Sequence, residues 1–245
     1  MPLKEEFRTT GEWMFRHRSY LPLLILVPMP FAVYFSVRPI SAHFGGLASD
    51  IFFIAISVLG LLVRCAIVGF TPKGTSGRNT KRQVAESLNT AGIYAYVRHP
   101  LYVGNFLIFM GIVAAVESLW FFVFSFLTYW LYYERIMYAE EEFLRDKFKA
   151  DFVEWAERTP AIIPKLGGWK QPPLEFSLRN VLKREYSAFY LIVVSFFILA
   201  TVERLIAGSS WFSPGWIVFL AAGTAIYVML LMLKKKTKLL FVEGR

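Results

Sequence analysis

The chain has 245 residues, of which 56% are hydrophobic, 18% aromatic and 18% charged. Soluble domains carry about 25% charged residues, and one of this size could not enclose so much apolar side chain. We therefore exclude a soluble globular protein, and the same numbers exclude a disordered one. The net charge of +9 is typical of basic cytoplasmic loops in membrane proteins, so nucleic acid is not an expected partner.

Six apolar segments approach the roughly 20 residues that a membrane-spanning helix needs. Prolines at positions 22, 28 and 30 predict a bend in the first segment, and residues 117–118 alone separate the third from the fourth as a tight hairpin. Because lipid offers the backbone no hydrogen-bond partners, the predicted fold class is all-α: a polytopic transmembrane helical bundle forming a single domain, residues 1–245. The segments are residues 20–37, 51–70, 101–116, 119–133, 187–202 and 211–233.

The distribution of basic residues predicts that both termini are cytoplasmic (N-in and C-in). In that orientation the outer loops contain only Arg38 and Arg204, and Arg64 lies within a span. The rest of the 27 Lys and Arg residues then fall on the inner side, as the positive-inside rule requires. Two cytoplasmic stretches, residues 71–100 and 134–186, are too long and too polar to be simple connectors. We expect a cytoplasm-facing active site there.

The first of these stretches ends with Arg98 and His99 at the mouth of the third span. Pro100 suits the first turn of a helix, so both side chains are expected beside a helix N-terminus, which attracts anionic groups such as a carboxylate. Gly104 removes a side chain from this turn and allows another group to pack closely. The alternative is an interfacial anchor of Arg and Tyr residues without a ligand.

Residues 134–158 predict a helix that continues the fourth span into the cytosol. At 100° per residue, Glu140 and Glu141 fall on the side of an apolar stripe, whereas Glu142 faces away. Two carboxylates on a packed face require a cation, which is either a basic side chain or a cationic ligand. The alternative is a salt-bridged amphipathic helix with Glu142 solvated. The stripe consists of Met137, Leu144, Phe148, Phe152 and Trp155.

A basic loop lies between the second and third spans. Gly74 and Gly77 allow its backbone N–H groups to face an anion, and the loop contains no acidic residue. We interpret it as a phosphate cradle, with ordinary positive-inside charge and attraction to anionic lipid as the alternative. Arg64, near the end of the second span, either reaches the same head group or extends its charge to the membrane surface. The basic residues of the loop are Lys73, Arg78, Lys81 and Arg82.

The sequence Arg-His-Pro-Leu-Tyr-Val-Gly at residues 98–104 resembles the RHPxYxG motif of the integral-membrane methyltransferases, which include isoprenylcysteine carboxyl methyltransferases and phospholipid methyltransferases. Residues 140–148 resemble the family's EExxLxxxFG block, and residues 158–164 resemble its closing RxP…IP. The resemblance covers residues 92–164. Lys149 replaces the usual glycine, and two further spans, residues 187–233, extend beyond the motifs that the resemblance covers.

The resemblance implies S-adenosylmethionine as the cofactor and a lipid-like acceptor in the bilayer. We expect the methyl group to go to an anionic phosphate or carboxylate oxygen, with Arg158 on the acceptor if the helix breaks between Glu140 and Arg158. Glu141 is the other expected catalytic residue, and no metal site is predicted. The residues expected to bind the cofactor are Arg98, His99, Pro100, Tyr102, Gly104, Glu140 and Glu141; those expected to bind the acceptor are Arg64, Arg78, Lys81 and Arg82.

Three alternatives stay open from the sequence. The first is carboxyl methylation of a prenylated substrate, and the second is an NADPH-dependent reductase of the sterol type. The third is a membrane scaffold or transporter without enzymatic activity, although carriers usually keep paired charges at mid-membrane and only Arg64 lies within a predicted span here. The acceptor's identity, the oligomeric state and the role of the last two spans are left open.

Overall fold

A computed structural model describes residues 1–36, 46–72, 74–75 and 83–245, and every regular element in these ranges is helical. The all-α prediction is therefore confirmed for this part of the chain. The α-helices are α1 (Leu3–His17), α2 (Met29–Ser36), α3 (Leu47–Phe70), α4 (Pro100–Ala114), α5 (Leu119–Phe148), α6 (Ala150–Arg158), α7 (Leu178–Ile206) and α8 (Pro214–Lys236); η1 (Leu21–Leu26) and η3 (Gly92–Ala95) are 3-10 helices.

Helices occupy all six segments predicted to span the membrane, but they differ in length. Among the described residues, α3, α7 and α8 are long and apolar enough to cross a bilayer. A fourth span is added if α1 and the stretch Leu21–Ser36, bent by 83° relative to each other, count as one broken span. These helices fit a multi-pass membrane protein, whereas the six-span count and the orientation of the termini stay predictions.

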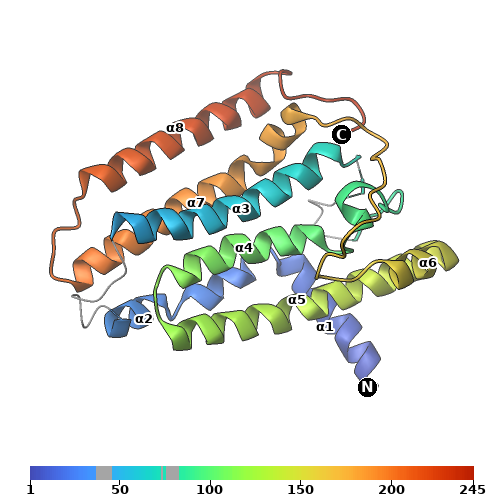
Figure 1. The fold of residues 1–245 in the computed structure, drawn as a ribbon, viewed down its shortest axis with the longest axis horizontal. Coiled ribbons are helices and arrows are strands. Elements are labelled where there is room, and N and C mark those ends of the chain that lie inside the picture. The colour runs from blue at the N-terminus through green and yellow to red at the C-terminus, as the bar shows by residue number, and fades with distance from the viewer. Residues whose placement is uncertain (37–45, 73, 76–82) are drawn as a thin grey trace.

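The long helices lie side by side, with α8 against α7, α7 against α3, α3 against α4 and α4 against α5 (Figure 1). Helices α3 and α4 approach very closely, because an added Cβ at Gly60 would lie 2.6 Å from the carbonyl oxygen of Gly104. Ser57 supports the same contact by donating a 3.0 Å hydrogen bond to the carbonyl of Ile108. Small residues thus bring the Arg-His-Pro end of α4 against the end of α3.

The N-terminal helix α1 packs against the C-terminal half of α5, a contact that the sequence analysis did not anticipate. Gly11 makes it possible, since a Cβ there would lie 2.1 Å from the carbonyl oxygen of Arg135. Lys4 pairs with Glu142 at 3.0 Å, and Glu142 is buried. The alternative of a salt-bridged helix had Glu142 solvated, and this is wrong: Glu142 does not line the cavity described below, but α1 covers it.

The helix that leaves the bundle breaks at Lys149. Helix α5 runs from the hairpin to Phe148, and α6 starts again at Ala150, extending past the end of the bundle (Figure 1). Lys149 has φ 49° and ψ −118°, a conformation that glycine adopts far more easily than any residue with a Cβ. This backbone explains why related sequences usually carry glycine here, and it meets the condition of a break between Glu140 and Arg158.

We expect Lys149→Gly to raise the free energy of unfolding by about 1 kcal/mol, because glycine relieves the strain of a positive φ. Lys147→Gly is the matched control: it lies within α5, is exposed, and should lower stability by about 1 kcal/mol. Thermal unfolding in detergent measures both. Equal destabilisation by the two substitutions would contradict the conformational explanation.

Candidate active site

The two motif blocks are joined through their backbones. The N–H of Arg98 donates to the carbonyl of Pro160 at 2.9 Å, and the N–H of His99 donates to the carbonyl of Ala161 at 3.0 Å. Pro100 then begins α4 as its first residue, as the sequence predicted. The Arg-Thr-Pro segment therefore contributes main-chain acceptors that hold the Arg-His-Pro segment at the start of α4.

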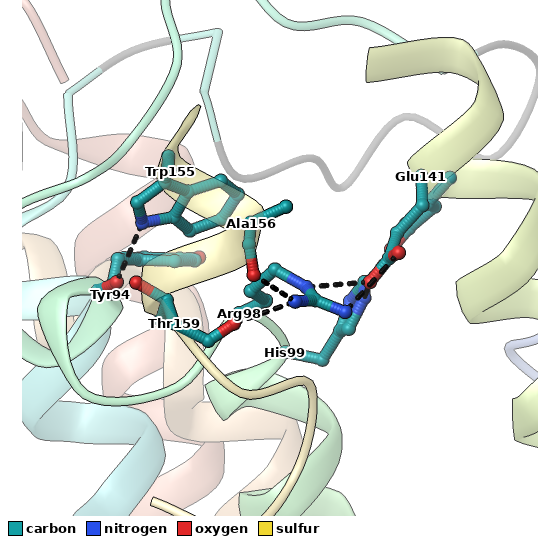
Figure 2. A network of polar contacts seen from close by, with 8 residues as sticks. Tyr94, Arg98, His99, Glu141, Trp155, Ala156 and Thr159 are labelled. Carbon is teal, nitrogen blue, oxygen red and sulfur yellow. Dashed lines mark hydrogen bonds and ion pairs between the residues drawn. The ribbon is translucent and has the colours of Figure 1, made fainter. Parts of the chain in front are cut away.

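The guanidinium of Arg98 connects three parts of the chain (Figure 2). Its Nε donates to Glu141 at 2.8 Å, and its Nη1 donates to the carbonyls of Ala156 and Thr159 at 2.7 and 2.6 Å. Nη2 adds a longer contact of 3.4 Å to the second oxygen of Glu141. Arg98 thereby fixes the end of α6 to α5, and most of its donors are already engaged. Trp155 adds a bond from its indole N–H to the carbonyl of Tyr94, at 3.2 Å.

The two adjacent carboxylates of α5 have different surroundings. Glu141 accepts bonds from Arg98 and contacts His99 Nε2 at 2.9 Å. Glu140 accepts a 2.8 Å bond from the Tyr102 hydroxyl, whereas Arg18 Nη1 and His99 Nδ1 lie 3.6 and 3.7 Å from its oxygens. Glu141 is therefore part of the clamp, and Glu140 keeps acceptor capacity toward the cavity.

Charges in this cluster shift two pKa values in opposite directions. Burial alone would lower the pKa of His99, but the negative charges of Glu140 and Glu141 and the hydrogen bond to Glu141 outweigh it and raise that pKa above 6.5. Burial would raise the pKa of Glu141, yet the hydrogen bond from His99 and the charge of Arg98 lower it below 4.5. The arrangement favours an imidazolium between two carboxylates.

We expect the thermal stability contributed by this cluster to be greatest between about pH 4.5 and 6.5. The raised pKa of His99 gives stability that is complete below 6.5 and is lost as pH rises through the folded-state value. The lowered pKa of Glu141 gives stability that is complete above 4.5 and is lost on acidification. Unfolding temperatures measured across pH should therefore fall on the alkaline side in the wild type, and His99→Gln should flatten that side. If the unfolding temperature of His99→Gln falls at alkaline pH as it does in the wild type, this pH dependence does not come from His99.

A cavity of about 500 Å³ adjoins this cluster. Glu140, Glu141 and His99 line it, together with Phe15 of α1 and Arg18, the residue that follows α1. Its lining also includes Arg64 of α3 with Arg184 and Glu185 of α7. The volume lies within the range of about 300–1,000 Å³ typical of small-molecule sites.

The structure brings most of the predicted cofactor residues together. Arg98, His99, Pro100, Tyr102, Glu140 and Glu141 all line the cavity, while Gly104 lies one turn into α4 against the stem of Arg64. Arg64 also lines the cavity, but instead of extending to the membrane surface it pairs with Glu185 at 2.7 Å. The other predicted acceptor residues, Arg78, Lys81 and Arg82, lie outside the described residues.

Arg158 is not brought to the cavity. Its side chain is 71% exposed and pairs at 3.0 Å with Glu154, one turn earlier on α6. The break at Lys149 redirects α6, but Arg158 remains on its solvent face, so this geometry gives no support to its predicted role on the acceptor. The closing motif contributes its main-chain carbonyls to the site rather than this side chain.

The cavity residues that the sequence analysis missed include Arg18, Asn105, Arg184 and Glu185. Arg18 and Glu185 lie far along the chain from the motifs, so no local spacing connects them to the site. The predicted position of Arg64 within a span did indicate that an acidic partner such as Glu185 exists, because a charge inside a span requires an opposite charge from another helix.

Part of the chain is similar to known proteins. Residues 50–151 match the family model described as phospholipid methyltransferase. The chain is 36% identical over 126 residues to the cobalt-zinc-cadmium resistance protein CzcN of Cupriavidus metallidurans, covering 51% of this chain and 49% of that protein. It is 32% identical over 137 residues to the nickel-cobalt-cadmium resistance protein NccN of Alcaligenes xylosoxydans xylosoxydans, covering 56% and 52% of the two chains.

A third relative is the protein-S-isoprenylcysteine O-methyltransferase of Schizosaccharomyces pombe, 32% identical over 85 residues, or 35% of this chain and 36% of that enzyme. No solved structure matches the chain. The alignments span about half or less of the length of these relatives. The helices and the cavity define a multi-pass membrane protein with a polar site at one end of its bundle. The family match and the motifs confirm the resemblance to the integral-membrane methyltransferase family.

Proposed function

We propose that this protein transfers a methyl group from S-adenosylmethionine to an anionic oxygen, phosphate or carboxylate, of a lipid-like acceptor held in the bilayer. The observation that carries the proposal is Glu140, a carboxylate with remaining acceptor capacity in a cavity beside the Arg-His-Pro start of α4. The family match supports methyl transfer as the reaction.

The residues of the cavity fit this cofactor. Glu140 would accept hydrogen bonds from its ammonium group, since His99 Nδ1 and Arg18 Nη1 lie beyond ordinary hydrogen-bond distance of the Glu140 oxygens. The first turn of α4 and Arg18 would face its carboxylate, because Arg98 is engaged with Glu141 and two carbonyls. When bound, S-adenosylmethionine supplies an electrophilic methyl group next to a sulfonium cation.

The chain's own residues suit an acceptor that is already anionic. An amine or a neutral hydroxyl requires a general base, and the raised pKa of His99 makes the imidazole a poor proton acceptor near neutral pH. An anionic oxygen requires none. Burial of the reacting groups among Phe15, Tyr102 and Tyr133 lowers the local dielectric, which favours a reaction that neutralises opposite charges.

The basic residues support a cytoplasmic site with both termini inside, as the sequence predicted. A reporter fused after Arg245 that is active only in the external compartment would contradict this orientation.

Calorimetric titration of the purified protein in detergent, separately with S-adenosylmethionine and NADPH, tests the proposal. We expect binding of S-adenosylmethionine alone; binding of NADPH alone favours the reductase, and binding of neither favours a scaffold. Incubation with lipid extract and isotopically labelled S-adenosylmethionine then identifies the acceptor as the lipid that gains label. Label released as methanol by mild base indicates a methyl ester on a carboxylate.

A further inference from the structure

Arg64 of α3 is hydrogen-bonded to side chains of two other helices. Its Nε and Nη2 donate to the two carboxylate oxygens of Glu185 on α7, at 2.7 and 3.1 Å, and its Nη1 donates to the side-chain oxygen of Asn105 on α4. The side chains of Arg64 and Glu185 are 19% and 5% exposed. A bidentate pair with a third bond fixes the plane of the guanidinium.

Attachment of α7 to α3 is a poor explanation for this pair. Removing two charges from water costs several kcal/mol per ion, and apolar residues of similar volume often stabilise a structure equally well or better. Charged residues within membrane-spanning helices mark functional sites for the same reason. Asn180 already links the two helices through a 2.8 Å bond from its side-chain N–H to the carbonyl of Val68.

The Arg-His-Pro motif itself makes room for Arg64. An added Cβ at Gly104 would lie 2.6 Å from Cγ of Arg64 and 2.9 Å from the carbonyl oxygen of Gly60. The glycine of the motif therefore leaves space for the arginine stem between α3 and α4. Glycine at this position and arginine at position 64 form one structural unit.

The head of Arg64 lines the same cavity as Glu140. Arginine has five N–H donors, and the three bonds to described residues leave one N–H on each terminal nitrogen unused. Arg184, the residue before Glu185 on α7, also lines the cavity. Arg64 and Arg184 bring two guanidinium groups to this wall, and guanidinium groups suit an anion.

We propose that Glu185 is a positioning residue of the acceptor site: it fixes Arg64 so that Arg64 and Arg184 bind the anionic head group of the lipid-like acceptor. The inference rests on the proposed function and deepens it. Helix α7 lies beyond residues 50–151, which match the family model, so the acceptor side of the cavity includes a helix outside the matched region. The arrangement places the cationic cofactor toward α5 and the anionic acceptor toward α3 and α7.

Binding of dodecyl phosphate, an anionic head group on a single alkyl chain, tests the proposal with the full chain in dodecyl maltoside micelles. Calorimetry should show that the wild type binds dodecyl phosphate more tightly than inorganic phosphate, which distinguishes a lipid head group from a free anion. Glu185→Gln and Glu185→Asp should each weaken dodecyl phosphate binding by about tenfold or more, the loss expected for one charged hydrogen bond. The affinity for S-adenosylmethionine should stay unchanged.

Two further variants separate positioning from a structural role. Asn180→Ala removes a bond between α7 and α3 without contacting Arg64, so it should lower the unfolding temperature and leave dodecyl phosphate affinity intact. The exchange of charges in Arg64→Glu with Glu185→Arg should restore the unfolding temperature lost in Glu185→Gln but not the affinity. If Glu185→Gln fails to fold, Glu185→Asp, which keeps the charge, is compared with the wild type instead.

Equal affinity of the wild type and Glu185→Asp for dodecyl phosphate overturns the proposal, as does absence of binding by the wild type. In either case, retained binding of S-adenosylmethionine leaves the proposed function standing. Loss of affinity for both compounds in Glu185→Asp assigns Glu185 a structural role and also overturns the proposal. Failure of the wild type to bind S-adenosylmethionine overturns the proposed function instead.

Discussion

Replacement of Arg98 by Lys is expected to lower the free energy of unfolding by about 3 kcal/mol, the lower end of the cost of breaking a buried ion pair. The guanidinium reaches Glu141 and the carbonyls of Ala156 and Thr159 at the same time. A lysine ammonium is a point charge without this planar fork, so it cannot serve all three groups. At least one carbonyl or the carboxylate then stays without its donor.

Thermal unfolding in detergent measures the loss, and limited proteolysis shows where it acts. Release of α6 should expose the chain near Lys149 in Arg98→Lys before the rest of the bundle is cut. Arg158→Lys is the matched control, because its exposed pair with Glu154 contributes at most about 1 kcal/mol. Equal stability of the two variants would show that Arg98 does not hold α6.

Local patterns in the sequence anticipated one side of the cavity. The helical phase placed Glu140 and Glu141 on one face, and both line the cavity with His99. The phase also turned Glu142 away from that face, but it could not show that α1 covers the opposite side. Burial of Glu142 depends on Gly11 and Lys4, which lie far away in the chain.

The sequence alone could not predict which groups bind the side chain of Arg98. An arginine beside a helix N-terminus was expected to bind a carboxylate of the cofactor, and the structure gives it Glu141 together with two main-chain carbonyls. Those carbonyls are available only because α6 ends beside Arg98, and this depends on the break at Lys149. The sequence shows that Lys149 replaces the glycine of the motif, but it does not show that Lys149 adopts a positive φ.

The other side of the site depends on contacts between distant helices. Arg64 was recognised as a charge within a span, and its partner Glu185 belongs to a helix whose role was left open. Helix α7 begins at Leu178, ahead of the apolar run from residue 187, and Arg184 and Glu185 before that run line the cavity. A hydropathy pattern marks only the lipid-facing part of such a helix.

The substitution Glu140→Gln is expected to weaken binding of S-adenosylmethionine by about 10- to 100-fold, which corresponds to the loss of one charged hydrogen bond. Glutamine keeps the size of the side chain and its bond from Tyr102, so the change removes only the negative charge. The unfolding temperature should fall less than in Glu141→Gln, because neither Arg18 nor His99 makes a short bond to Glu140.

Two matched variants on the same helix make this prediction specific. Glu134→Gln changes an exposed carboxylate of α5 and should leave affinity unaltered. Glu141→Gln removes the charge that holds Arg98 and His99, so it should lower the unfolding temperature as well as the affinity. Calorimetry with S-adenosylmethionine and thermal unfolding on the three proteins give the comparison. If Glu140→Gln binds S-adenosylmethionine as tightly as Glu134→Gln, the ammonium group is not held by Glu140, and the cofactor lies elsewhere in the cavity.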